Sequence, residues 1–203
     1  ALAAAYAVGI VHRDVKPANV ILLGGDPARP RLIDFGIARV GAQNLTSPGG
    51  VLGTPGYMAP EQARGEPNID ARADVFALGC VMYECISGRR AFDGDSPMAI
   101  LAKVLLEEPP RLREARRDVP AALEHVVDRM LAKVKESRYG SAGEVVRDLE
   151  RLDVSTEEKA RVSRGSGALG TRERRLLSLV VARQGAAPAK DATLVDDPSG
   201  EEG

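Results

Sequence analysis

The stretch from His12 to Asn19, with the apolar run Val20–Leu23 that follows it, constrains the fold of this chain most. The eight residues read His-Arg-Asp-Val-Lys-Pro-Ala-Asn, so an imidazole, a carboxylate, two cations and an amide lie close together. Pro17 excludes a regular helix there. We therefore expect a rigid polar loop beside a buried strand, an arrangement that can hold a catalytic group in place. By composition alone, the same residues could form a charged surface turn.

Two further motifs follow downstream, Asp34-Phe35-Gly36 and Ala59-Pro60-Glu61. With residues 12–19 they resemble the signature set of protein kinases, which comprises the H-R-D-x-K-x-x-N catalytic loop, the D-F-G metal motif and the A-P-E motif. Each motif alone is a weak signal, whereas all three in this order are specific. The chain is identified as similar to Ser/Thr-type protein kinases, and Pro60-Glu61-Gln62 resembles the sequence of bacterial members. The resemblance extends over residues 1 to about 152.

The hydrophobic pattern predicts a mainly helical fold with a small β-hairpin, an α+β class. A helix over Ala1–Val8 is expected to stop at Gly9. Strands are expected over residues 20–23 and 31–33, joined by the turn residues Gly24-Gly25-Asp26-Pro27.

Four more helices are predicted further along the chain. Residues 73–87 are apolar nearly all round, which is typical of a buried helix. The others are expected over residues 96–107, over the apolar series from Leu123 to Val134, and after the capping box Ser141–Glu144.

Residues 1–152 are interpreted as the C-lobe part of a kinase domain, and residues 153–203 as a linker and disordered tail. Within the tail, residues 173–182 combine a charged cluster with a strand-like segment. They faintly resemble the first strand of class III nucleotide cyclase domains, so a further domain could start there; a short helix or loop is the default. The G-x-G-x-x-G pattern at 165–170 has no strand before it, which favours a flexible linker over a nucleotide loop.

The resemblance also implies elements that would precede Ala1. A kinase covers ATP with a glycine-rich loop and contacts its phosphates with a strand lysine. Both belong to the N-lobe, and neither matches a segment of this sequence. We therefore expect a C-lobe without its N-lobe, and an isolated chain that is inactive or nearly so.

Composition excludes several classes of partner. With 28 Lys and Arg against 29 Asp and Glu, the net charge of −1 gives no argument for binding nucleic acid or a membrane. The longest apolar run of the tail, Leu176–Ala182, is too short to span a bilayer. Cys80 and Cys85 match neither a metal pair nor a disulfide framework, so a reducing cytoplasm fits best. Membrane attachment through segments outside this chain stays open.

The resemblance assigns the chemistry to five residues. Asp14 would accept the proton of a substrate hydroxyl or orient it for in-line attack, and Lys16 would face the transferred phosphate. Asn19 and Asp34 would ligate Mg²⁺, which prefers a few hard oxygen ligands plus phosphates. Ile21 would form the apolar floor under the adenine. ATP and Mg²⁺ are thus the expected cofactors, and proteins with Ser or Thr hydroxyls the expected substrates.

Arg13, next to the expected catalytic aspartate, suggests control by phosphorylation, because an arginine there can pair with a phosphate on the activation segment. That segment is expected within residues 37–59, which show no periodicity. Thr46 and Ser47 are the candidate phosphate acceptors, or simply turn residues. Thr54 resembles the family's threonine that contacts the catalytic aspartate and lysine. It is therefore interpreted first as a positioning residue and second as a phosphorylation site.

Four residues are expected to support the site structurally. His12 would pack and hydrogen-bond beneath the D-F-G turn. Asp74 would accept hydrogen bonds from the backbone of the catalytic loop, or act as a favourable charge at the start of its helix. Glu61 and Arg138 resemble the buried ion pair that ties the activation segment to the helical base of the kinase fold.

The leading interpretation is an enzyme that transfers the γ-phosphoryl group of ATP to Ser or Thr of proteins. The alternative is a non-catalytic kinase-like module that binds partners through its helices and activation segment. Asp14, Lys16, Asn19 and Asp34 are all present, and a binding module has no need of all four. The sequence does not identify the protein substrate, the activating signal, the oligomeric state or the neighbouring domains.

Overall fold

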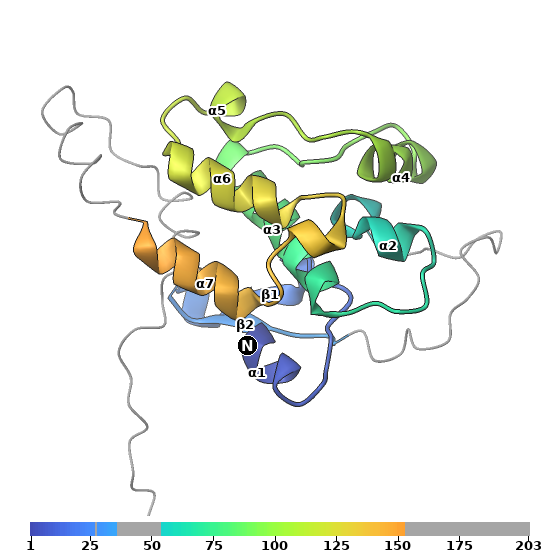
Figure 1. Ribbon diagram of the computed structural model, residues 1–203. Helices are drawn as coiled ribbons and strands as arrows, with labels where there is room; N and C mark the ends of the chain where they lie inside the picture. The colour runs from blue at the N-terminus through green and yellow to red at the C-terminus, as the bar shows by residue number, and fades with distance from the viewer. Residues whose placement is uncertain (27, 36–53, 153–203) are drawn as a thin grey trace, which may run out of the picture.

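The structure of this chain, a computed structural model, describes residues 1–26, 28–35 and 54–152 (Figure 1). The predictions for the tail, including residues 165–170 and 173–182, fall outside these residues. So do the candidate phosphate acceptors Thr46 and Ser47.

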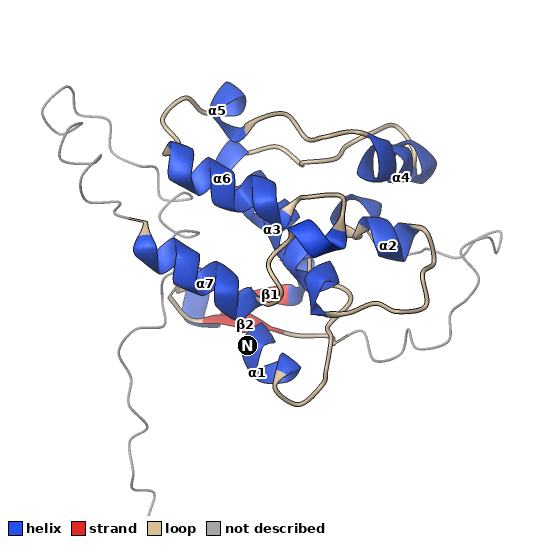
Figure 2. Cartoon of the chain, in the orientation of Figure 1, coloured by secondary structure: helices blue, strands red, loops and turns tan. Residues whose placement is uncertain are grey.

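Helices predominate in the described residues, and a two-stranded sheet accompanies them (Figure 2). The α-helices are α1 Leu2–Tyr6, α2 Pro60–Ala63, α3 Ala71–Ser87, α4 Pro97–Leu106, α5 Leu112–Ala115, α6 Ala121–Met130 and α7 Ala142–Arg151. Short 3-10 helices cover η1 Pro17–Asn19, η2 Leu23–Gly25, η4 Pro55–Tyr57 and η5 Lys135–Ser137. The strands are β1 Val20–Leu22 and β2 Pro30–Leu32. The predicted class, mainly α with a small hairpin, is confirmed for this part of the chain.

The two strands pair antiparallel, with Val20 opposite Leu32 and Leu22 opposite Pro30. The connection begins with the 3-10 turn η2, in which Gly24 and Gly25 both take positive φ angles, 66° and 73°. Such angles are readily available to glycine and strained for other residues. The Gly-Gly pair thus allows the chain to turn directly after β1.

Helix α3 is the centre of the core, and α6 and α7 lie against it (Figure 1). Ten of its 17 residues are buried, which agrees with its lack of a polar face in the sequence. The Asp70 carboxylate accepts a hydrogen bond from the Arg72 N–H at its start, and Gly88 ends it with a φ of 74°.

Helices α3 and α6 approach each other closely at Gly79. A Cβ at this position would lie 2.9 Å from Met130 Cβ and 3.1 Å from a Leu131 methyl carbon. Phe76 on α3 stacks on Phe92, with ring centroids 5.9 Å apart. The core here has no room for additional side-chain volume.

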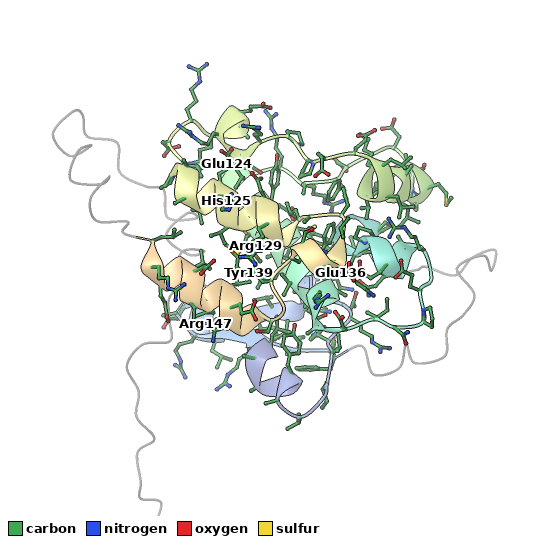
Figure 3. All side chains as sticks on the ribbon, in the orientation of Figure 1. Glu124, His125, Arg129, Glu136, Tyr139 and Arg147 are labelled. Carbon is green, nitrogen blue, oxygen red and sulfur yellow. The ribbon has the colours of Figure 1, made fainter. Side chains whose placement is uncertain are left out.

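Tyr139 contacts both α6 and α7 and so connects the two helices. Its hydroxyl donates to Asp148 Oδ2 on α7 at 3.0 Å, and the Arg129 guanidinium of α6 lies 4.1 Å from its ring centroid. Figure 3 labels Arg129 and Tyr139 where the two helices meet. His125 lies exposed on α6, as expected for an ordinary surface side chain.

Three local predictions differ from the structure. The first helix covers Leu2–Tyr6 rather than residues 1–8, although Gly9, with a φ of 75°, does follow its end. Val134 does not continue α6, which stops at Met130, and its side chain is 59% exposed.

The capping box at Ser141 is also wrong. Ser141 is the N-cap residue of α7, yet its side chain forms no capping hydrogen bond. The Glu144 carboxylate instead accepts from the N–H of Gly140, at 3.0 Å, one residue earlier than a capping box requires. The helix starts where predicted, but the Glu144 carboxylate accepts from the N–H of Gly140 and not from that of Ser141.

Within the described part of the chain, no helix combines the length and the apolar character that crossing a membrane requires.

Candidate active site

The loop of residues 12–19 brings three predicted catalytic side chains together. Lys16 Nζ lies 2.8 Å from Asp14 Oδ2. The amide nitrogen of Asn19 donates to Asp14 Oδ2 at 3.2 Å and to the Asp14 backbone carbonyl at 2.8 Å. The carboxylate of Asp14 thus has a cation and an amide as neighbours, while 19% of its side chain stays exposed. It is held in place and still accessible to a substrate.

Pro17 begins the 3-10 turn that places Asn19. Both acceptors of the Asn19 amide are oxygens, so Nδ2 must face Asp14. This orientation leaves Oδ1 as the atom of Asn19 that could ligate a cation.

The antiparallel hairpin brings Asp34 to the same end of the hairpin as Asn19. The N–H of Ile33 donates to the Asn19 carbonyl at 2.9 Å, so Asp34 is the next residue beyond that contact. Asp34 is exposed and has a φ of 55°, in the left-handed region that is uncommon for non-glycine residues. A carboxylate and an amide oxygen fit Mg²⁺, which takes one or two protein carboxylates and completes its shell with phosphates and water.

Asp74, at the start of α3, is fully buried and fixes the backbone of the loop. Its two oxygens accept from the N–H groups of His12 and Arg13, both at 2.7 Å. The Tyr6 hydroxyl donates to the same carboxylate at 3.1 Å. Burial raises the pKa of Asp74, and the two backbone hydrogen bonds oppose that rise because they stabilise the carboxylate. Burial and the nearby carboxylate raise the pKa of Tyr6 as well.

His12 is fully buried and joins the loop to the segment around Asp34. Its Nε2 lies 3.0 Å from the Ile33 carbonyl, and its Nδ1 lies 3.2 Å from the Asp14 N–H. A neutral ring with the proton on Nε2 satisfies both contacts. The ring also packs on Phe35 of the D-F-G motif, with centroids 4.6 Å apart. These contacts give His12 the geometry of a supporting residue.

Glu61 and Arg138 form a bidentate ion pair, with contacts of 2.7 and 2.8 Å between buried side chains. Arg138 also donates to the backbone carbonyls of Arg72, Ala132 and Lys133. All five guanidinium N–H positions are thereby used. The pair links α2 to the start of α3 and to the loop before α7.

Three other predicted residues occupy more open positions. Arg13 is half-buried and has a φ of 65°. Thr54 is half-buried and immediately precedes η4. Ile21, in the middle of β1 opposite Arg31, is 45% exposed and so presents an apolar side chain on the hairpin.

Comparison with known proteins agrees with this geometry. The family model described as "Protein kinase domain" matches residues 1–148. The chain belongs to the protein kinase family. It is 44% identical over 147 residues to the serine/threonine-protein kinase PknB of Mycolicibacterium smegmatis, covering 71% of this chain and 23% of that protein. It is 42% identical over 167 residues to the serine/threonine-protein kinase Pkn1 of Myxococcus xanthus, covering 80% of this chain and 24% of that protein. The chain therefore spans about a quarter of the length of these kinases.

The sequence did not single out two side-chain contacts, made by Gln62 and by Tyr57. Gln62 on α2 donates from Nε2 to the Arg13 carbonyl at 3.0 Å. The Tyr57 hydroxyl hydrogen-bonds to the Glu84 carboxylate on α3. Burial is the main cause that raises the pKa of Tyr57, and this hydrogen bond raises the pKa further. The position of Gln62 as third residue of a short helix after Ala59-Pro60 indicates a capping contact with Ala59. No local pattern points to its contact with Arg13 or to the contact between Tyr57 and Glu84.

Proposed function

We propose that the protein carrying this chain is a Ser/Thr kinase that transfers the γ-phosphoryl group of ATP to protein hydroxyls. The observation that carries the proposal is the arrangement of Lys16 and Asn19, which both lie within hydrogen-bonding distance of the Asp14 carboxylate. The proximity of Asp34 to Asn19 along the hairpin supports it further.

Each side chain has a role that its contacts suit. Asp14 would accept a hydrogen bond from the attacking hydroxyl and hold it in line with the phosphorus. Lys16, which already contacts Asp14, would place its positive charge against the transferred group. Asn19 Oδ1 and an Asp34 carboxylate oxygen would hold Mg²⁺, which supplies charge neutralisation on the phosphates when bound. Ile21 would contact the adenine through its exposed apolar surface.

We further propose that this chain is the C-lobe of the kinase and is inactive or nearly so by itself. Its described part is mainly helical, and the β-hairpin is the sheet that accompanies those helices. A glycine-rich loop and a strand lysine on another segment would then complete the nucleotide site.

The test uses the intact gene product and the 203-residue chain side by side. Each is incubated with Mg²⁺, labelled ATP and a Ser- and Thr-containing protein, and the phosphorylated residues are mapped by mass spectrometry. We expect labelled Ser or Thr with the intact protein and a background signal with the chain.

Asp34→Asn in the intact protein should abolish transfer, whereas the matched control Asp95→Asn, at an exposed position, should retain it. Transfer by the isolated chain that Asp34→Asn abolishes would refute the C-lobe proposal. A well-folded intact protein that phosphorylates neither itself nor any substrate would favour the alternative, a kinase-like binding module.

A further inference from the structure

Gln62 links the start of α2 to the loop that carries Asp14. Its Oε1 accepts from the Ala59 N–H at 3.1 Å, and its Nε2 donates to the Arg13 carbonyl at 3.0 Å. One partner is a donor and the other an acceptor, so the orientation of the amide is fixed. The two contacts join segments 49 residues apart in the chain.

The Arg13 carbonyl belongs to the same peptide unit as the Asp14 N–H, and this unit is held at both ends. Gln62 donates to its oxygen, and His12 Nδ1 accepts from its N–H at 3.2 Å. The preceding peptide unit is held through the Arg13 N–H, which donates to Asp74. Because a peptide unit is planar, fixing both of its ends fixes the position of the Asp14 Cα, from which the Asp14 side chain leaves the backbone.

Arg13 needs this support because its φ of 65° is uncommon for a residue with a side chain. The surroundings must determine such a conformation if it is to persist. Asp74 fixes one side of Arg13 and Gln62 the other.

We propose that Gln62 is a positioning residue for Asp14, acting through the Arg13 carbonyl; this proposal rests on the kinase function proposed above. Gln62 makes the position of the catalytic loop depend on the placement of α2, the helix directly after the activation segment. A residue that only capped α2 would need an acceptor for the Ala59 N–H and no donor. Glutamate supplies that acceptor equally well at the third helical position. The amide group alone provides both.

This difference gives a sharp test in the intact gene product. Gln62→Glu is nearly isosteric and keeps the acceptor for Ala59, but it removes the donor to the Arg13 carbonyl. Gln62→Leu removes both. Arg64→Gln, an exposed change at the end of the same helix, is the control. The readouts are kcat, the KM for ATP, the melting temperature, and backbone amide hydrogen exchange of the peptide covering residues 10–19.

With Gln62→Glu we expect kcat to fall about 3- to 10-fold, the range that one lost hydrogen bond in the transition state produces. The KM for ATP should stay within about twofold, because Gln62 does not act on nucleotide binding in this account. The melting temperature should stay close to that of the wild type, and exchange in residues 10–19 should accelerate. Arg64→Gln should match the wild type in all four readouts.

Unchanged kcat and exchange in Gln62→Glu, with only a lower melting temperature in Gln62→Leu, would overturn the proposal and leave Gln62 as a helix cap. The exchange measurement separates this proposal from the proposed function. Accelerated exchange in Gln62→Glu, combined with a wild-type protein that shows no kinase activity, would refute the function while supporting the positioning contact.

Discussion

Replacing Arg138 by methionine should destabilise the fold strongly, because it leaves the Glu61 carboxylate buried without its partner. Both side chains of the pair are almost completely buried, at 0% and 2% exposure. Breaking a buried ion pair by removing one partner costs about 3–5 kcal/mol. Three backbone carbonyls, those of Arg72, Ala132 and Lys133, also lose their donor. For a protein of this size, the loss corresponds to a decrease in melting temperature of about 6–20 °C.

Thermal unfolding followed by far-UV circular dichroism measures the effect. Arg151→Met is the matched control, since this arginine is 76% exposed and pairs with Asp148 at the surface. An exposed pair contributes about 0–1 kcal/mol, so the control should shift the melting temperature little. Adding Glu61→Gln to Arg138→Met should recover part of the loss, because the uncompensated charge disappears. Equal shifts for Arg138→Met and Arg151→Met would refute the reasoning.

Two further predictions concern the core around α3. Gly79→Ala should lower the free energy of unfolding by about 1–3 kcal/mol, since the new methyl group would lie 2.9 Å from Met130 Cβ and force the helices apart. Urea unfolding measures this loss, and an unchanged midpoint would contradict the close approach of the helices. Lys133 donates to the Val104 carbonyl at 2.8 Å and lies 4.0 Å from the Phe92 ring centroid, and burial lowers its pKa to about 8. Because this pKa lies below the ordinary value of 10.5, the folded state binds fewer protons between these values, and stability rises with pH there. The melting temperature of the wild type should therefore increase relative to Lys133→Met as the pH rises from 8 toward 10.5, and a relative decrease would contradict the shift.

Local features of the fold could be predicted because the sequence marks them locally. The turn residues Gly24-Gly25-Asp26-Pro27 predicted the hairpin, and the continuous apolar character of residues 73–87 predicted a buried helix. The same approach failed at Ser141, because two neighbouring N–H groups compete for the Glu144 carboxylate and the sequence does not rank them.

The prediction of long-range polar contacts depended on the resemblance to kinases. Glu61 and Arg138 are 77 residues apart, and no periodicity connects them. The family motifs suggested the pairing, and the structure contains it. Gln62 directly follows the Ala59-Pro60-Glu61 motif, and in the sequence it indicates only a resemblance to bacterial members. Its contact with the Arg13 carbonyl depends on how α2 approaches the loop, which becomes visible only in three dimensions.

We propose that Asp14 directs phosphoryl transfer from the loop that it shares with Lys16 and Asn19. The most direct test is the single-turnover rate of phosphate transfer by intact Asp14→Asn, measured at saturating Mg²⁺ and ATP. A positioned acid or base contributes about 10²–10⁴ in rate, so the rate should fall at least about 100-fold. The affinity for ATP should remain within a few-fold of the wild type. A transfer rate within a few-fold of the wild type would contradict the account.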